Sequence, residues 1–113
     1  MRKRLPLILG VLAGALLLIQ LFPVDGSNPP AQEEIPAPPE VRAVLEGSCY
    51  DCHSNRTAWP WYSYVAPASW LVADHVHEGR RELNFTTWNA YPPDKQAKKI
   101  HEVAEEVQEG KMP

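Results

Sequence analysis

The chain has 113 residues, among them twelve prolines, four histidines and two cysteines, and its formal net charge at pH 7 is −3. This length allows one domain at most. From residue 26 onward, thirteen Asp or Glu stand against eight Lys or Arg. This acidic balance argues against nucleic acid as a partner, because phosphates require a basic surface.

The first segment is basic and then apolar. Residues 1–4 read MRKR, and residues 5–22 carry no charge, with Gln20 as the polar exception. About 18 residues at roughly 1.5 Å each make a helix close to the hydrocarbon thickness of a bilayer. We predict a single transmembrane helix within residues 1–24, with the rest of the chain on the periplasmic side of the bacterial cytoplasmic membrane. A signal peptide cleaved near residues 24–26 stays open as the alternative.

A proline-rich segment follows, since six of the twelve prolines lie in residues 23–40. It has few large apolar side chains and cannot bury enough surface to offset its ordering entropy. We predict a semi-extended tether over residues 25–39. The remaining residues, 40–113, form the predicted functional domain, which is small enough to need a metal, a disulfide or a cofactor as a staple.

The predicted domain contains helical patterns and no strand pattern. A short helix is expected over residues 40–47 and a second over residues 68–83, and a third begins near residue 93 and stops at Gly110. Two apolar stripes are expected to face inward. They consist of Leu71, Val72, His75 and Val76 on the second helix, and of Ala97, Ile100, Ala104 and Val107 on the third.

Shorter structures are expected between these helices. Residues 57–67 are too interrupted by proline for a long helix, and residues 84–88 suggest a turn or a helix N-cap. The domain is therefore predicted to be all-α.

Both cysteines lie in GSCYDCHSN, residues 47–55. Three chemistries place two thiols and a histidine so close together: a redox dithiol, a zinc site and covalent haem attachment. A redox dithiol follows a strand, and none is predicted here. A zinc site needs a second pair of ligands, and His75 and His77 are two apart on a predicted helix, so they face different sides.

The haem reading fits the motif best. C-x-x-C-H is the attachment pattern of haem c. Thiols three residues apart on a helical turn can each add to one vinyl group of the same porphyrin. We predict one covalent haem c, with Cys49 and Cys52 as thioether residues and His53 as the proximal iron ligand.

The opposite axial ligand must come from a distant part of the chain. Met112 lies just beyond a predicted helix end, and its thioether is a suitable soft ligand. His75 is the rival. Among the aromatic residues, we expect Trp59, Trp61 and Trp70 to line the porphyrin, the largest apolar object available to so small a domain.

Four motifs in order carry a resemblance to a known family: CYDCHSN, WPWYSYVAPASWLV, HEGRRELNFTTW and EEVQEGKMP. Over residues 38–113 they resemble the small bacterial haem-binding domain proteins of the cytochrome c type, often anchored by one N-terminal helix. The resemblance implies a cytochrome c-like helical module around one haem. It also implies covalent haem at Cys49 and Cys52, His53 as proximal ligand and Met112 as distal ligand.

The expected function is that of a membrane-anchored monohaem c-type protein that passes single electrons. Its expected partner is a redox protein or a membrane electron-transfer chain. No acid–base pair of fixed spacing stands beside the motif, so we name no catalytic residue and place electron carriage ahead of enzyme activity. Two alternatives stay open: a haem-based sensor or peroxidase-like enzyme with a labile sixth ligand, and a zinc-stapled structural module.

Overall fold

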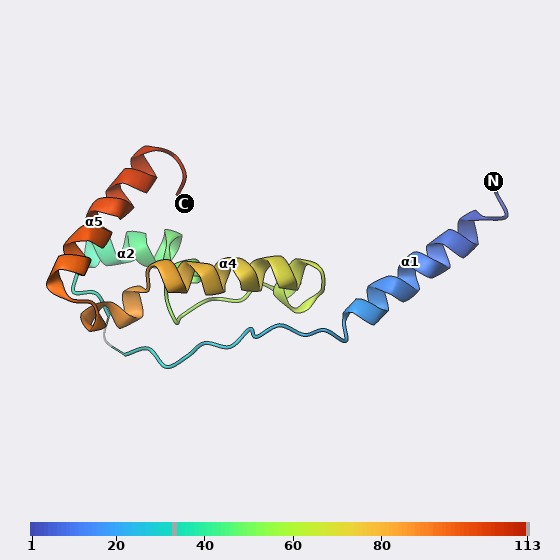
Figure 1. Ribbon diagram of the computed structural model, residues 1–113, viewed down its shortest axis with the longest axis horizontal. Helices are drawn as coiled ribbons and strands as arrows, with labels where there is room; N and C mark the ends of the chain where they lie inside the picture. Colours follow the sequence, from blue (N-terminus) through green and yellow to red (C-terminus); the bar gives the residue numbers. More distant parts are fainter. Residues whose placement is uncertain (33, 113) are drawn as a thin grey trace. The chain divides into compact units, whose positions relative to one another are not determined.

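The computed structural model describes residues 1–32 and 34–112 (Figure 1). Glu33 of the predicted tether and Pro113 at the end of the predicted domain lie outside the described residues. Every regular element in the described ranges is a helix. The prediction of an all-α fold is therefore confirmed.

The chain divides into two units. The first consists of Met1–Gly26 and Trp59–Asp74, and the second of Ser27–Ala58 and the chain from His75 onward. Each is described by itself below. The helix α4, Ala68–Glu82, contributes residues to both.

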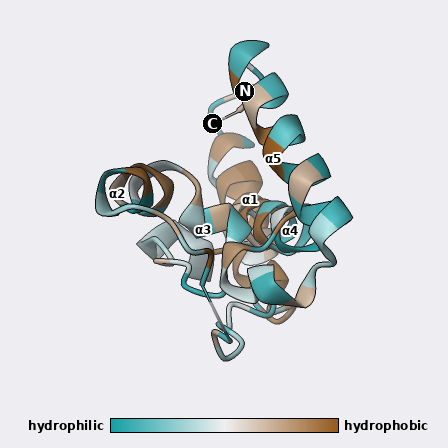
Figure 2. Ribbon diagram, turned by 90° about the vertical axis from the view of Figure 1, so that its left-hand side faces the viewer, coloured by the Kyte–Doolittle hydropathy of each residue, from teal (hydrophilic) through white to brown (hydrophobic). Residues whose placement is uncertain are grey.

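The first unit contains α1, an α-helix of 15 residues over Leu5–Ile19. Proline suits its first turn because the fixed backbone angle is already helical. None of its side chains is buried, and its apolar character is visible in brown in Figure 2. The predicted 5–22 helix ends early, because residues 20–22 form tighter turns in which each N–H donates to a carbonyl three residues back. In the part of the chain that the structure describes, no helix combines the length and apolar character needed to span a membrane.

The proline-interrupted stretch of the first unit has little regular structure. It forms one short 3-10 helix, η1, over Trp61–Tyr64, and then enters α4 at Ala68. The expectation that proline would prevent a long helix here is confirmed.

The second unit contains the other helices: α2 (Pro39–Ser48), α3 (Tyr50–His53), η2 (Phe85–Ala90) and α5 (Pro93–Gln108). Prolines begin α2 and α5, where a missing N–H costs no helical hydrogen bond. At the start of η2, the side chain of Asn84 accepts a hydrogen bond from the N–H of Thr86. The expected N-cap within residues 84–88 is therefore confirmed.

The described residues of the predicted tether before Pro39 form no helix, and those from Ser27 onward belong to the second unit. The N–H of Gln32 donates to the carbonyl of Thr86 at 3.1 Å, and that of Ile35 to the carbonyl of Phe85 at 3.0 Å. Ile35 also packs against the core. Gln32 and Ile35 therefore lie along η2 within the second unit.

The core of the second unit is mainly aromatic and consists of Tyr50, Leu83, Phe85 and Trp88. The rings of Tyr50 and Phe85 stack with centroids 5.8 Å apart, and those of Phe85 and Trp88 at 6.3 Å. Because Tyr50 belongs to α3, this stacking fixes the CYDCH turn against η2.

Both predicted apolar stripes need correction. On α4, Val76 is buried as predicted and Val72 is half-buried, but Leu71 and His75 are exposed, and Ala73 is buried instead. On α5, the whole predicted stripe is exposed, with Ile100 at 58 %. The partly buried face of α5 instead carries Gln96, Lys99, Glu102, Val103 and Glu106.

Candidate functional site

The CYDCH motif forms one helical turn. The N–H of His53 donates to the carbonyl of Cys49 at 2.9 Å, and the N–H of Cys52 donates to the same carbonyl at 3.2 Å. Residues three and four positions apart share one helix face. The two thiols and the imidazole therefore start from the same side of this turn, and both cysteines are free.

The imidazole of His53 is oriented by the last turn of α4. Its Nδ1 lies 2.9 Å from the carbonyl oxygen of Gly79 and 3.1 Å from that of Leu83. Carbonyl oxygens only accept hydrogen bonds, so Nδ1 carries the proton and Nε2 keeps its lone pair. This arrangement leaves Nε2 available to a metal ion, while the hydrogen bonds at Nδ1 fix the orientation of the ring.

Gly79 permits the close approach of α4 to this turn. A Cβ at position 79 would overlap the carbonyl oxygen of Cys52 and lie 3.0 Å from its carbonyl carbon. Glycine at position 79 is therefore needed for the contact between α4 and the backbone of Cys52, because backbone atoms cannot move aside as the end of a flexible side chain can. Because residue 79 has no side chain, its carbonyl oxygen lies within hydrogen-bonding distance of His53.

A buried polar network holds the loop that follows His53. The N–H of Asn55 donates to Oγ1 of Thr86 at 2.9 Å, and Nδ2 of Asn84 donates to Oδ1 of Asn55 at 2.8 Å. Arg80 donates through Nε to the carbonyl of Ser54 at 2.8 Å. These bonds join α4 and η2 to the residues directly after His53.

A cavity of about 430 Å³ opens beside His53. Its size lies within the range of roughly 300–1,000 Å³ that is typical of cofactor sites. Cys49, His53 and Met112 all line it, although they lie far apart in sequence. Its apolar walls are Val44, Leu83, Phe85, Val103 and Val107.

Some of these wall residues are strongly exposed. Val44 is 64 % exposed, Val107 51 % and Met112 46 %. Large apolar side chains that line a cavity and remain open to water indicate a surface for an apolar ligand. Phe85 is buried at the base of the cavity and meets the His53 ring edge-on, with centroids 6.5 Å apart.

Met112 reaches the cavity because the chain reverses after α5. Gly110 has a φ of 73°, in the left-handed region that glycine adopts without strain. The N–H groups of Lys111 and Met112 then donate back to the carbonyl of Glu106 at 3.0 and 3.3 Å. The predicted helix stop at Gly110 is confirmed. The chain turns back after α5 (Figure 1), and Met112 lines the cavity.

The charged lining of the cavity is mostly acidic. Glu82, Glu102 and Glu106 line it together with Lys99. The Lys99 side chain is 15 % exposed, and its Nζ lies 3.4 Å from a carboxylate oxygen of Glu102. Lys99 thus supplies a cation within an otherwise acidic rim.

The thiols do not have the electrostatics of a redox dithiol. Burial raises the pKa of Cys49, and the neighbouring Cys52 raises it further. Burial also raises the pKa of Cys52, with a smaller contribution from Asp51. Reactive dithiols have a lowered thiol pKa, so the structure disfavours that reading of the motif.

The structure also disfavours the zinc reading. Across residues 1–32 and 34–112, no three His, Cys, Asp or Glu side chains come together to hold a metal ion. His75, the rival distal ligand, is exposed and does not line the cavity. The expectation that it points inward is wrong, because Ala73 and Val76 occupy the buried positions of α4 instead.

Sequence reasoning named some of the site and missed the rest. Cys49, His53 and Met112 meet at the cavity, and Cys52 lies one turn from Cys49. Trp59, Trp61 and Trp70 belong to the first unit and do not line this cavity; their contact with a porphyrin stays a prediction. The missed residues are Gly79, whose proximity to the motif no sequence signal indicates, and the wall residues Val44, Leu83, Phe85 and Val103.

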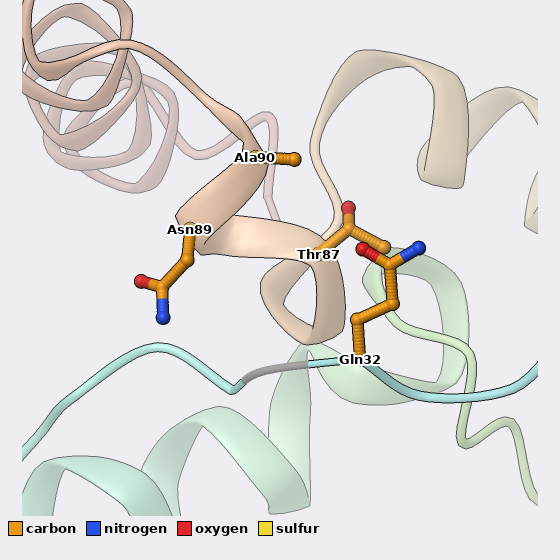
Figure 3. A pocket seen from close by; sticks show the side chains of 4 residues that line it. All are labelled: Gln32, Thr87, Asn89 and Ala90. Carbon is orange, nitrogen blue, oxygen red and sulfur yellow. The ribbon is translucent and has the colours of Figure 1, made fainter.

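A second cavity, of about 330 Å³, lies at η2. Gln32, Thr87, Asn89 and Ala90 line it (Figure 3). These side chains are amides, a hydroxyl and a methyl group, without a thiol, an imidazole or a carboxylate. The chemistry-bearing residues therefore gather at the larger cavity.

The comparison with protein families agrees with this geometry. Residues 14–113 match the model of a family described as the haem-binding domain. The chain belongs to this haem-binding domain family. No curated protein and no solved structure gives a significant match. The protein is therefore a small all-helical haem-binding protein.

The larger cavity fits a haem by its own chemistry. Its walls are apolar, His53 offers a free Nε2, and Met112 offers a thioether, which are ligand types of haem iron.

Proposed function

We propose that this chain binds one haem c covalently through Cys49 and Cys52, in the cavity beside α3. The observation that carries this proposal is that Cys49, His53 and Met112 line one apolar-walled cavity. In the proposed site, His53 is the proximal ligand and Met112 the distal ligand. Bound haem iron supplies one-electron chemistry, with a potential raised by thioether ligation.

The chain's own residues favour electron transfer over substrate chemistry in this proposal. Nδ1 of His53 donates to the carbonyls of Gly79 and Leu83, and these hydrogen bonds keep the ring in one orientation. Side chains of the chain fill both proposed axial positions. A carrier of single electrons needs no open coordination place, whereas an enzyme or sensor does.

A haem-based sensor or peroxidase-like enzyme is the second candidate. Met112 is 46 % exposed, and it follows a helix end held by a glycine turn. A ligand supported in this way can leave the iron at modest cost in free energy. If it does so under working conditions, a small molecule takes the sixth position.

We also propose that residues 1–24 anchor the protein in the bacterial cytoplasmic membrane as a single helix, with the haem domain on the periplasmic side. The basic residues of MRKR precede an apolar run, and the side chains of α1 are exposed. This placement suits a redox partner that is part of, or next to, a membrane electron-transfer chain.

The test is an optical and gel analysis of the full chain, produced in a host that attaches haem c. Wild-type protein should keep its haem stain on a denaturing gel, and Cys49→Ala with Cys52→Ala should lose it. The oxidised protein should show the weak long-wavelength sulfur-to-iron charge-transfer band of His/Met ligation. Wild-type protein that carries haem removable by denaturation would overturn covalent attachment.

A further inference from the structure

The first unit exposes a group of aromatic and aliphatic side chains outside α1. Trp61 is 77 % exposed, Tyr64 70 % and Leu71 60 %. We call this group the aromatic surface; with the less exposed members, it consists of Trp61, Tyr62, Tyr64, Val65, Trp70 and Leu71. The surfaces of soluble monomeric proteins rarely expose so many large apolar side chains unless a protein, a ligand or a membrane binds there.

The aromatic surface lies in an uncharged stretch of sequence. From Thr57 to Ala73 there is no Asp, Glu, Lys, Arg or His, although Arg56 and Asp74 stand at its two ends. A docking site for an ordinary water-soluble protein would carry a polar rim. The absence of charge instead suits the headgroup–acyl boundary of a bilayer.

Hydrogen bonds tie this stretch to the end of α1. The side chain of Gln20 donates to the carbonyl of Ala66 at 3.0 Å and accepts from the N–H of Ala66 at 2.9 Å. The indole Nε1 of Trp70 donates to the carbonyl of Phe22 at 3.0 Å. The end of the apolar helix and the aromatic surface therefore belong to one structural unit.

We propose that the aromatic surface lies in the outer interface of a phospholipid bilayer, at the level where α1 leaves the membrane. Trp and Tyr are enriched at this level because their rings are apolar and their N–H or O–H groups find polar partners. The inference rests on the proposed membrane anchor. For Trp61 and Trp70, it replaces contact with the porphyrin as the proposed role.

The test uses the full-length haem protein in two measurements. In the first, Leu12→Lys with Leu16→Lys disrupts insertion of α1, and flotation with phosphatidylethanolamine/phosphatidylglycerol vesicles measures the remaining binding. This variant should still bind, more weakly than wild type. Adding Trp61→Ser, Tyr64→Ser and Leu71→Ser should abolish binding, whereas adding Ile100→Ser should not. Ile100 is a matched control because it is 58 % exposed and lies on α5, outside the cavity lining.

The second measurement is hydroxyl-radical oxidation read by mass spectrometry. In lipid nanodiscs, oxidation of Trp61 and Tyr64 should be severalfold slower than in the lipid-free Leu12→Lys, Leu16→Lys protein. Oxidation of His101, an exposed residue of α5, should not change. Haem absorbance and the gel haem stain show whether each variant is folded and loaded.

The outcomes separate the inference from the proposed function. If wild type floats but Trp61 and Tyr64 are oxidised as fast as without lipid, the inference is wrong and the anchor stands. If wild type does not float, both fail, while the haem stain still reports on the haem proposal. Protection of Trp61 without lipid, at the mass of a dimer, would show that a second copy covers the surface and would also overturn the lipid assignment.

Discussion

The two proposed iron ligands, His53 and Met112, line the same cavity but are supported in different ways. His53 lies on a helical turn that α4 contacts at Gly79, and its ring donates to carbonyls at 2.9 and 3.1 Å. Met112 is 46 % exposed and depends on a turn at Gly110 and on backbone bonds to Glu106. The proximal ligand is thus fixed by tertiary packing, and the distal ligand by a local backbone conformation.

This difference implies different responses to mutation. A change on the proximal side disturbs several elements at once and should affect folding. A change on the distal side should alter ligation and leave folding nearly intact.

The proximal packing should fail in Gly79→Ala. The added methyl group meets the Cys52 backbone, which separates α4 from the motif and removes the His53 hydrogen bonds. We expect a loss of roughly 3 kcal/mol in the free energy of unfolding, at the upper end for overpacked sites, and little haem-stained protein. Urea unfolding followed by circular dichroism measures it.

Gly47→Ala is the matched control for this substitution. A Cβ at position 47 meets nothing within 4 Å, and the residue lies in α2. Alanine is the better helix former, so this variant should be as stable as wild type or more stable by up to about 1 kcal/mol. Equal unfolding curves for the two alanine variants would contradict the proximal packing described above.

The distal ligand should be lost in Met112→Ala with little effect on folding. The charge-transfer band should disappear, the reduction potential should fall, and carbon monoxide should bind the ferrous protein. The denaturant midpoint should move little, since the side chain is about half exposed.

His75→Ala is the control for the distal ligand, because His75 is exposed and outside the cavity lining. It should leave the spectrum unchanged. A spectrum altered by His75→Ala and not by Met112→Ala would assign the distal position to His75. Immediate binding of carbon monoxide by wild type would favour the sensor or enzyme candidate.

An intermediate effect is expected for Gly110→Ala. A side chain in the left-handed region costs about 1–2 kcal/mol, and the strain is relieved when the turn opens and Met112 moves away. The charge-transfer band should weaken and not vanish, in contrast to Met112→Ala. An unchanged band together with unchanged stability would show that the turn does not hold Met112 in place.

The smallest effect is expected for Lys99→Gln. This change leaves Glu102 without its partly buried partner, beside two other carboxylates of the cavity. Lys98 is a matched control, because it also faces Glu102, at 4.0 Å, but is 75 % exposed. Lys99→Gln should lower the free energy of unfolding by about 1 kcal/mol and Lys98→Gln by less than about 0.5 kcal/mol, both reduced by salt. If denaturant titrations at low and high salt gave equal losses for the two variants, a larger contribution to stability from Lys99 than from Lys98 would be contradicted.

Several features of this protein follow from local sequence. The CYDCH spacing places two thiols and an imidazole on one turn, because residues three and four apart share a helix face. Prolines begin α2 and α5, Asn84 caps η2, and Gly110 ends α5. Each of these features depends on backbone preferences within a few residues, which the sequence states directly.

Apolar periodicity was a poorer guide to which helix faces point inward. On α5 it selected Ala97, Ile100, Ala104 and Val107, which are exposed. The inward face instead carries Lys99 and Glu102, whose charged ends pair with each other at the cavity. Of the four predicted residues, only Val107 lines the cavity, whereas Val103, outside the predicted stripe, both lines it and packs against the core.

What the sequence by itself determined is therefore the placement of two thiols and an imidazole on one turn, the helical class and the ends of most helices. Only the tertiary structure decided that Met112 shares a cavity with His53 and that His75 does not. It also decided that the carbonyls of Gly79 and Leu83 set the tautomer of His53. These relations join residues that are tens of positions apart, and they depend on how α3, α4, η2 and α5 pack, which no local pattern records.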